Sequence, residues 1–317
     1  MTMPISMIIA AAVASAPAPA DAAPRLYACG GDQIREYRIE SGRSVEVWRW
    51  RAADATDLPA RYRTALLAHI DDCKPVDGGR GILVTASTGG VVLIERVSGR
   101  VTFRATAPMA HSADMLPGGM IAVALSIDPK GDRLEVYDRT RSETPLLHLP
   151  LPSGHGAVWD RARDRLFVLS HDLIQAYRVA GTSSAPVLTE SARWTLPGRR
   201  DGHDLSRRPD GRYLVTTDDG VWTFDPDAGD PDAGDAAGPA GGRPEGRPPA
   251  PGTYTPLPAL NPRPRVKAVG MMGGRLAWVQ AEESWWAKGF TIARADGSDP
   301  VRIPVEGMRL YKVRWIR

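Results

Sequence analysis

The chain has 317 residues, of which 43% are hydrophobic and 24% charged, so it can bury a large core and is neither collagen-like nor wholly disordered. Its 40 basic and 37 acidic residues leave a net charge of only +3, with both signs scattered along the chain. This distribution excludes the clustered basic surface that nucleic-acid binding needs.

The first 23 residues predict a secretory signal peptide. An apolar stretch over residues 5–14 is followed by small residues and by Ala-x-Ala sites near Ala18 and Ala20. No Lys or Arg precedes the apolar stretch, which leaves a disordered Ala/Pro-rich tail as the alternative. The rest of the chain has no apolar run of about 18 residues, so we expect no membrane span and a secreted or extracytoplasmic protein.

The chain has two cysteines, Cys29 and Cys73. In the oxidising environment to which a signal peptide leads, these two can form a disulfide bond. A single pair in a large domain is equally compatible with two buried free thiols. The sequence leaves both states open.

Short apolar runs recur with a period of about 45 residues, which is typical of a repeat architecture. One kind of run includes "GILVTAS" from Gly81, "RLFVLS" from Arg165 and "RLAWVQ" from Arg275. A second kind follows it and ends in a charged residue, as in "IREYR" from Ile34 and "VLIER" from Val92. Because these runs are short and rich in β-branched and aromatic residues, they predict strands rather than helices.

The first repeat lacks the segment that precedes the other five, and the C-terminal "RLYKVRWI" from Arg309 supplies the missing strand. Six units of four strands, closed by the last strand pairing into the first unit, predict an all-β six-bladed β-propeller as a single domain over residues 25–317. Such closure removes exposed sheet edges. A pair of β-sandwiches is the alternative architecture, because evenly spaced short strands also fit it. We expect a monomer.

An Asp/Gly/Pro-rich stretch over residues 225–252 interrupts the fifth unit. Its duplicated "DPDAG" has the acidic density of a calcium loop, but the prolines and the missing terminal glutamate argue against one. The composition predicts a disordered surface loop inserted in blade five.

Candidate site residues come from the first strand of each unit, which lines the central channel of a propeller. Three histidines begin the first strands of consecutive units: His111, His155 and His203. Lysines stand at matching places in the other units, aligned to within one residue: Lys74, Lys267 and Lys312. Aspartates lie among these cations: Asp71, Asp72, Asp114 and Asp204. Because the chain has only five lysines among its 40 basic residues, three of them in channel strands suggest a need for a compact ammonium.

Several roles are open to this set of residues. It suits an anionic or polyhydroxylated ligand, an ordered column of water, or a metal ion held by His111, His155 and His203. The same histidines and aspartates can instead serve only to tie neighbouring blades together by hydrogen bonds. No cofactor is indicated. We expect the Trp159-Asp160 pair that follows His155 to be structural.

The stretch "EESWWAKG" from Glu282 predicts a loop on the same face as the histidines. The adjacent Trp285 and Trp286 can form a platform for stacking a sugar, because aromatic faces pack against the apolar face of a pyranose. The alternative is that one of these tryptophans packs into the next blade.

The segments around the three histidines carry a resemblance: "HSADMLPGGMIAVALS", then "GHGAVWDRARDRLFVL", then "DGHDLSRRPDGRYLVTT", and later "VKAVG" and "SWW". In this order they resemble an uncharacterised family of secreted bacterial six-bladed propellers, over about residues 25–316. The resemblance implies the propeller fold and a connection with polysaccharides, but no established activity. The long loop in blade five departs from the family pattern.

The sequence thus favours a secreted propeller that binds a carbohydrate or another anionic or polyhydroxylated ligand in a funnel lined by histidines and lysines. One alternative is a lyase or hydrolase acting on polysaccharides, with a histidine base and possible metal dependence. Another is a non-catalytic scaffold for protein interactions. The chain has no nucleophile elbow, phosphate-binding loop, dinucleotide fingerprint or Cys-x-x-Cys pair, so whether it is an enzyme stays open.

Overall fold

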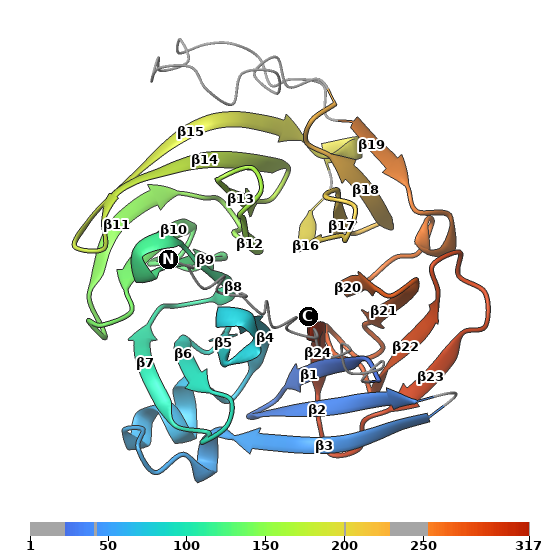
Figure 1. Ribbon diagram of the computed structural model, residues 1–317, viewed down its shortest axis with the longest axis horizontal. Coiled ribbons are helices and arrows are strands. Elements are labelled where there is room, and N and C mark those ends of the chain that lie inside the picture. The colour runs from blue at the N-terminus through green and yellow to red at the C-terminus, as the bar shows by residue number, and fades with distance from the viewer. Residues whose placement is uncertain (1–22, 41–42, 200, 229–252, 317) are drawn as a thin grey trace, which may run out of the picture.

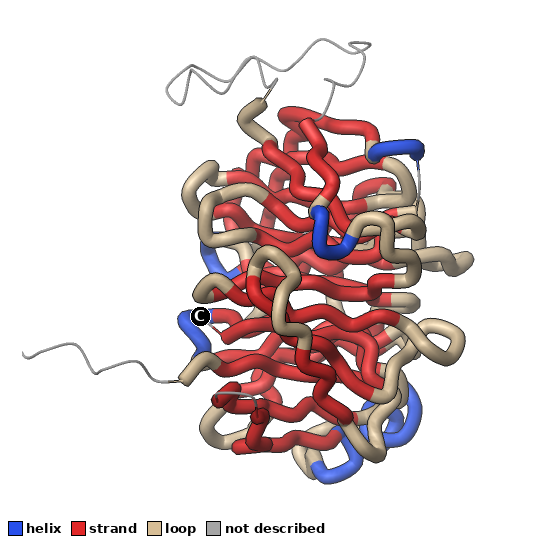
Figure 2. Tube along the Cα trace, turned by 90° about the vertical axis from the view of Figure 1, so that its right-hand side faces the viewer, coloured by secondary structure: helices blue, strands red, loops and turns tan. Residues whose placement is uncertain are grey.

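The computed structural model describes residues 23–40, 43–199, 201–228 and 253–316, which form six four-stranded antiparallel sheets arranged in a ring (Figure 1). This is a six-bladed β-propeller, and the predicted fold class is confirmed. In the side view of Figure 2, the strands run between two faces made of loops and short helices.

The four strands of each blade follow one another from the central channel to the rim of the ring. From inner to outer strand, blade 1 contains β24 (Leu310–Ile316), β1 (Arg25–Gly30), β2 (Gln33–Glu40) and β3 (Arg43–Arg51). Blade 2 contains β4 (Ile70–Val76), β5 (Gly81–Ala86), β6 (Gly90–Glu95) and β7 (Val101–Thr106). Blade 3 contains β8 (Ala110–Met115), β9 (Met120–Leu125), β10 (Arg133–Asp138) and β11 (Pro145–Pro150).

Blade 4 contains β12 (Gly156–Asp160), β13 (Arg165–Leu169), β14 (Leu173–Thr182) and β15 (Ala185–Thr195). Blade 5 contains β16 (Gly202–Arg207), β17 (Tyr213–Thr217), β18 (Val221–Asp225) and β19 (Thr253–Pro256). Blade 6 contains β20 (Val266–Met272), β21 (Arg275–Gln280), β22 (Gly289–Arg294) and β23 (Val301–Pro304). The short helices are η1 (Ala52–Asp54), η2 (Tyr62–Leu66), η3 (Asp77–Gly79), η4 (Pro117–Gly119), η5 (Pro197–Arg199) and η6 (Pro258–Leu260).

The second strand of a blade is the most apolar because neighbouring blades cover both of its faces. All six residues of β5 ("GILVTA") and of β9 ("MIAVAL") are buried. The outer strand β3 ("RSVEVWRWR") is mostly exposed by contrast. Continuous apolar runs are what a strand buried on both faces requires, and they are the runs that made the repeat visible in the sequence.

The ring is closed as the sequence predicts. β24 pairs antiparallel with β1, with Leu26 opposite Trp315 and Ala28 opposite Val313. The first blade is therefore built from both ends of the propeller domain, and its inner strand is the last strand of the chain (Figure 1). This pairing leaves no open sheet edge at the junction of the two ends.

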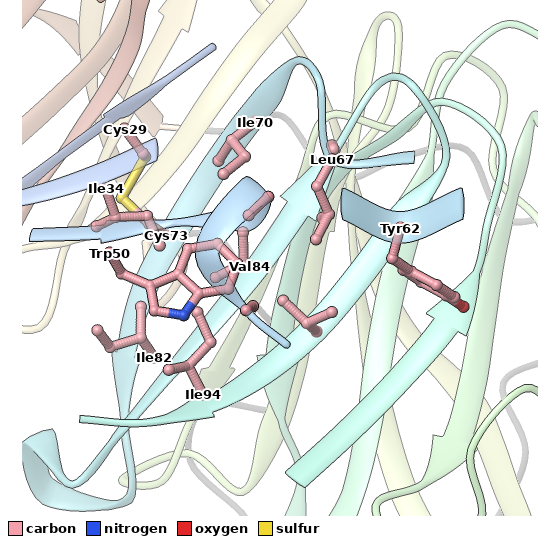
Figure 3. Close-up of a cluster of buried hydrophobic side chains, with 14 of the residues drawn as sticks. Cys29, Ile34, Trp50, Tyr62, Leu67, Ile70, Cys73, Ile82, Val84 and Ile94 are labelled. Atoms are coloured by element: carbon pink, nitrogen blue, oxygen red, sulfur yellow. A yellow bond between two sulfur atoms is a disulfide. The ribbon is translucent and has the colours of Figure 1, made fainter. Parts of the chain in front are cut away.

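A disulfide bond joins the first two blades. Cys29 in β1 is bonded to Cys73 in β4, with 6.1 Å between their Cα atoms. The bond lies in an apolar cluster that includes Trp50, Ile82 and Val84 (Figure 3). Of the two states that the sequence left open, the structure has the disulfide, and it fastens blade 2 to the blade that closes the ring.

Two predicted segments fall outside the described residues: the signal peptide, in residues 1–22, and most of the blade-five loop, in residues 229–252. Both stay predictions. No helix in the described part of the chain is long and apolar enough to cross a lipid bilayer.

Candidate functional site

Six side chains occupy equivalent places near the start of the inner strands. Near its start, an inner strand leaves one residue out of its pairing with the second strand. In β4 the pairing passes from Ile70 to Asp72, and in β8 it passes from Ala110 to Ser112. In blade 4, the residue just before β12 takes the same place. We call these six residues the channel ring: Asp71, His111, His155, His203, Lys267 and Tyr311. A bulge of this kind re-aims a side chain and is over-represented next to active sites.

The side chains of the channel ring converge and are buried. The ring centroids of His111 and His155 are 4.5 Å apart, and those of His155 and His203 are 5.6 Å apart. Tyr311 packs edge-on against His111, with 6.3 Å between their centroids. The three predicted histidines therefore do meet in one place, at the channel end where the inner strands begin.

The predicted alignment of the lysines to within one residue holds for two of them. Lys267 is a member of the channel ring, whereas Lys312 directly follows the ring residue Tyr311. The placement of Lys74 to within one residue is wrong, because Asp71 occupies the ring position and Lys74 lies three residues beyond it. The sequence alignment matched Lys74 to the histidines by its charge, whereas the pairing of β4 with β5 puts Asp71 at the equivalent place.

Two of the imidazoles are held in a fixed tautomer by their own backbone. Nδ1 of His111 lies 3.0 Å from the carbonyl oxygen of Met109, and Nδ1 of His155 lies 2.9 Å from that of Ser153. A carbonyl oxygen only accepts, so each Nδ1 carries the proton and each Nε2 is an acceptor. Met109 and Ser153 have φ angles of 53° and 51°, a left-handed conformation that non-glycine residues rarely adopt.

Burial makes the histidines neutral at pH 7. It lowers the pKa of His111 to about 4, with a further contribution from nearby Lys312. It also lowers the pKa of His155 far below the usual value and, together with Lys267, lowers the pKa of His203. Burial raises the pKa of the Asp71 carboxyl well above its ordinary value. Burial in the channel ring thus opposes charge on the three histidines and on Asp71.

The lowered pKa values of the histidines predict that mild acid removes their contribution to stability. A histidine whose pKa is lowered on folding contributes stability that is present above the unfolded pKa of about 6.5 and is lost as pH falls toward the folded value. For His111, with a folded pKa of about 4, the loss between about pH 7.5 and pH 5 is about 2 kcal/mol. Urea unfolding of the parent and of His111→Asn at both pH values measures it. The variant should lose about 2 kcal/mol less than the parent on acidification, and equal losses would contradict the assignment.

A cluster of opposite charges fills the middle of the channel. Arg314 in β24 donates to both oxygens of Asp72, at 2.7 and 2.9 Å, and to both oxygens of Asp204, at 2.8 and 2.6 Å. Lys312 also donates to Asp204, at 3.1 Å. Asp72 belongs to blade 2 and Asp204 to blade 5, on opposite sides of the ring, so Arg314 lies between them at the centre.

The members of this charged cluster stabilise one another's ionised forms. Burial alone would raise the pKa of Asp72 and of Asp204, but Arg314 and Lys312 hold both pKa values below the usual range. The two carboxylates in turn raise the pKa of Arg314 in spite of its burial. Ser112 completes the cluster by donating to Asp72 at 2.9 Å. Charges that are this fully paired serve structure, and they separate the channel ring from the other end of the channel.

A cavity of about 370 Å³ opens at that other end, where the inner strands finish. We call it the mouth cavity. All six inner strands contribute to its lining, which includes Lys74, Asp114, Trp159, Arg161, Arg207, Arg314 and Trp315. Its volume lies within the range of about 300–1,000 Å³ that is typical of small-molecule sites.

The polar side chains of the mouth cavity differ in how many hydrogen-bond or ion-pair partners they already have. Arg161 is exposed and has no ion-pair or hydrogen-bond partner among the described residues. Lys74 is buried and donates to the carbonyl oxygen of Ala157, which leaves it two further donors. Asp114 accepts from the backbone N–H groups of Met115 and Trp159, at 2.8 and 2.9 Å. The cavity therefore offers unused cationic donors and a carboxylate that is already bonded.

The predicted site residues are thus divided among three places. The channel ring holds His111, His155, His203 and Lys267, and the charged cluster holds Asp72, Asp204 and Lys312. Lys74 and Asp114 line the mouth cavity. Sequence reasoning missed Tyr311, Arg314, Trp159 and Arg161. Aligning "HSAD", "HGAV", "HDLS", "KAVG", "YKVR" and "DDCK" residue by residue would have found Tyr311 and Arg314.

The two adjacent tryptophans lie away from the mouth cavity. Trp285 is 58% exposed, whereas Trp286 packs against His69, with 5.5 Å between ring centroids. The guanidinium of Arg309 lies 5.4 Å from the Trp286 ring centroid. Trp286 thus packs against other side chains, which is the alternative that the sequence left open for one of the two tryptophans.

A metal site on the three histidines finds no support in their placement. Across residues 23–40, 43–199, 201–228 and 253–316, no three or more His, Cys, Asp or Glu side chains are grouped so that they could hold a metal ion. His111 and His155 each direct Nδ1 to a backbone carbonyl, and His203 directs Nε2 to Asp218 at 2.8 Å.

Comparison with known proteins agrees with the fold and gives no activity. The model of a family described as "Family of unknown function (DUF6528)" matches residues 33–232. No curated protein matches the chain. Both results leave the chemistry of the channel to be argued from its residues.

Two solved structures share the fold at low identity. One is a protein of unknown function from Bacteroides caccae, 12% identical, with a TM-score of 0.55 over 93% of this chain and all of that one. The other is a chain of a nidogen/laminin complex, 15% identical, with a TM-score of 0.57 over 93% of this chain and 98% of that one. At such identities the likeness shows the fold alone.

Proposed function

The chain belongs to DUF6528, a family of unknown function, and we propose that it binds a small anionic, polyhydroxylated ligand, such as a sugar acid, in the mouth cavity. The observation that carries this proposal is a cavity of about 370 Å³ whose lining includes two tryptophans, an incompletely bonded lysine and an arginine that has no partner in the part of the chain that the structure describes.

The charges of the cavity favour an anion. Arg207 and Arg314 line it but already have carboxylate partners, in Asp160 and in the charged cluster. Arg161 and Lys74 remain available, and Arg161 presents the planar fork of donors that matches a carboxylate. Burial lowers the pKa of Lys74, and a bound carboxylate would favour the charged form of its amine.

The tryptophans favour a ligand with an apolar face. Trp159 is partly exposed in the cavity wall. Trp315 lines the cavity from blade 1, with its Nε1 donating to the carbonyl oxygen of Gly270, at 3.2 Å. A pyranose has both an apolar face for an aromatic wall and hydroxyl groups for polar neighbours such as Ser206. A sugar acid therefore fits the lining better than a simple inorganic anion does.

This proposal keeps the class of ligand that the sequence favours and moves its place. The histidines were expected to line the funnel, but they are buried in the channel ring, behind the charged cluster. Of the lysines, Lys74 remains in the proposed site and Lys267 and Lys312 do not. The disulfide supports a protein that acts outside the cytoplasm, which agrees with a signal peptide in the first 23 residues.

The surface gives less support to an interaction scaffold. Such a protein would carry a contiguous apolar patch on one face. The large apolar side chains that are exposed in the described part of the chain are spread over five blades or their loops: Val45, Val47, Val97, Ile127, Val187, Trp285 and Val301.

A glycan array followed by calorimetry tests the proposal. We expect acidic sugars to bind in preference to neutral ones, and Arg161→Ala to weaken binding about tenfold, because a charge-assisted hydrogen bond is worth about 1.5–3 kcal/mol. Arg141→Ala is the matched control, because Arg141 is exposed in blade 3 and does not line the cavity. Failure to bind any acidic sugar, or equal affinity of Arg161→Ala and the parent, would contradict the proposal.

A further inference from the structure

The end of the channel opposite the mouth cavity contains the amine of Lys267, which has no part in the binding proposed for that cavity. Nε2 of His203 lies 3.1 Å from Nζ of Lys267 and 2.8 Å from Oδ1 of Asp218. One ring nitrogen thus has two polar neighbours. Because that nitrogen either carries a proton or does not, the protonation of all three groups is linked.

The hydrogen bonds show where the proton lies. Nδ1 of His203 is buried and has no hydrogen-bond partner among the described residues, unlike Nδ1 of His111 and His155. A neutral imidazole has one N–H, which belongs where an acceptor waits, at Nε2 beside the Asp218 carboxylate. Lys267 then faces an N–H group. An ammonium has no lone pair to offer such a donor, whereas a neutral amine does.

The surroundings of Lys267 also favour the neutral amine. Its side chain is buried between blades 5 and 6, and the charged groups nearest to it are of both signs: Asp218, Arg265, Asp201 and Lys312. Burial lowers the pKa of Lys267 to about 8 in spite of the opposing effect of Asp218. Desolvated lysines of this kind attack carbonyl carbons.

The amine lies close to solvent. The side chain of Asp218 is 51% exposed and contacts His203, which contacts Lys267 in turn. The path from solvent to the amine is therefore two side chains long. Asp218 and Lys267 contact the same ring nitrogen of His203, so the imidazole and the carboxylate form a short path for protons beside the amine.

We propose that Lys267 captures a small carbonyl compound, an aldehyde or α-keto acid, as an imine, with His203 and Asp218 moving the proton. The amine lone pair forms the C–N bond while the carbonyl π electrons move to oxygen, and one of the two protons on the nitrogen then passes through His203 to that oxygen. The second proton passes from the nitrogen through His203 to the Asp218 carboxylate and from there to the departing hydroxyl. The C–O bond breaks, water leaves and the C=N bond forms, with no oxidant or reductant involved.

Reductive trapping on the full chain tests this proposal. The protein is incubated near pH 7.5 with glyoxylate and cyanoborohydride, and the modification of each lysine is followed by peptide mass spectrometry. The exposed Lys130 is the internal control. We expect Lys267 to be modified at least about tenfold faster than Lys130, because a larger fraction of its amine is neutral at that pH.

A variant separates proton transfer from simple exposure of the amine. Because the Asp218 carboxylate opposes the lowering of the Lys267 pKa, Asp218→Asn is compared with the parent at about pH 9.5, where the Lys267 amine is largely neutral in both. There the variant should slow the modification of Lys267 several-fold and leave that of Lys130 unchanged. Asp299→Asn, which alters a carboxylate exposed on blade 6, should change neither rate. Modification of Lys267 no faster than that of Lys130 in the parent would overturn the proposal, and so would an undiminished rate in Asp218→Asn. Neither outcome bears on binding in the mouth cavity.

Discussion

Replacing Arg314 by methionine is expected to lower the free energy of unfolding by about 3–5 kcal/mol at neutral pH. The side chain makes four hydrogen bonds of 2.6–2.9 Å to Asp72 and Asp204, and both carboxylates are buried. Without the guanidinium, two carboxylates from opposite blades would face each other in the channel with Lys312 as their remaining close cation. Urea unfolding followed by circular dichroism measures the change.

An exposed ion pair of the same chemistry provides the control. Arg294 donates to Asp299 at 2.8 Å, but these side chains are 71% and 73% exposed. Arg294→Met should cost less than about 1 kcal/mol, because solvent screens such pairs. A cost for Arg314→Met no greater than that of Arg294→Met would show that the charged cluster does not hold the blades together.

The stabilisation by the charged cluster should also depend on pH in a defined direction. The pKa values of Asp72 and Asp204 are lowered in the folded protein, so their contribution is present above the unfolded pKa of about 3.9 and disappears as pH falls below it. This pH range lies below the pH range in which the contribution of His111 to stability is lost. Acid unfolding should therefore have two components, of which the one at higher pH belongs to the channel ring.

Removing the disulfide is expected to have an effect of similar size. The Cys29→Ala/Cys73→Ala double variant should lose about 4 kcal/mol, because the bond closes a loop with a sequence separation of 44 and restricts the unfolded chain. The double variant leaves no free thiol that could form wrong bonds. Its unfolding is compared with that of the parent under oxidising conditions.

The alternative outcome for the disulfide is equally clear. A loss below about 1 kcal/mol would mean that β24 and the surrounding apolar cluster hold blades 1 and 2 together without the bond. Reduction of the parent by a thiol reagent should reproduce the loss of the double variant. A parent that loses far more stability on reduction than the double variant would show that the free thiols themselves disturb the core.

The sequence predicted the blades because their signals are local. Runs such as those of β5 and β9 are apolar throughout, and turn residues such as Gly78-Gly79 and Gly118-Gly119 mark where each inner strand meets the next. The closing strand was found because the first unit lacked one. These features depend on residues within a few positions of each other, so a single sequence contains them.

The site was harder to predict because its parts meet only in three dimensions. Asp71 rather than Lys74 reaches the channel ring, and the residue types of "DDCK" alone do not show which of the four takes that place. Arg314 joins residues that are 242 and 110 positions away. Trp159 looked structural beside Asp160, which is indeed bonded to Tyr213 and Arg163, yet the tryptophan itself lines the mouth cavity.

The structure thus assigns different chemistry to the two ends of the channel. The ring end has neutral imidazoles and an amine, the middle is closed by paired charges, and the mouth has unused cationic donors beside tryptophans. Most of the predicted histidine and lysine site is therefore internal, and Lys74 and Asp114 are the predicted residues that line the mouth cavity.

Binding of an acidic sugar in the mouth cavity is tested most directly by a crystal structure of the protein soaked with a hexuronate. We predict the sugar carboxylate within about 2.7–3.2 Å of the Arg161 guanidinium or the Lys74 ammonium, with the sugar ring against Trp159 or Trp315. A hexuronate bound at the histidine end of the channel, or a mouth cavity free of sugar at saturating concentration, would contradict the proposed site.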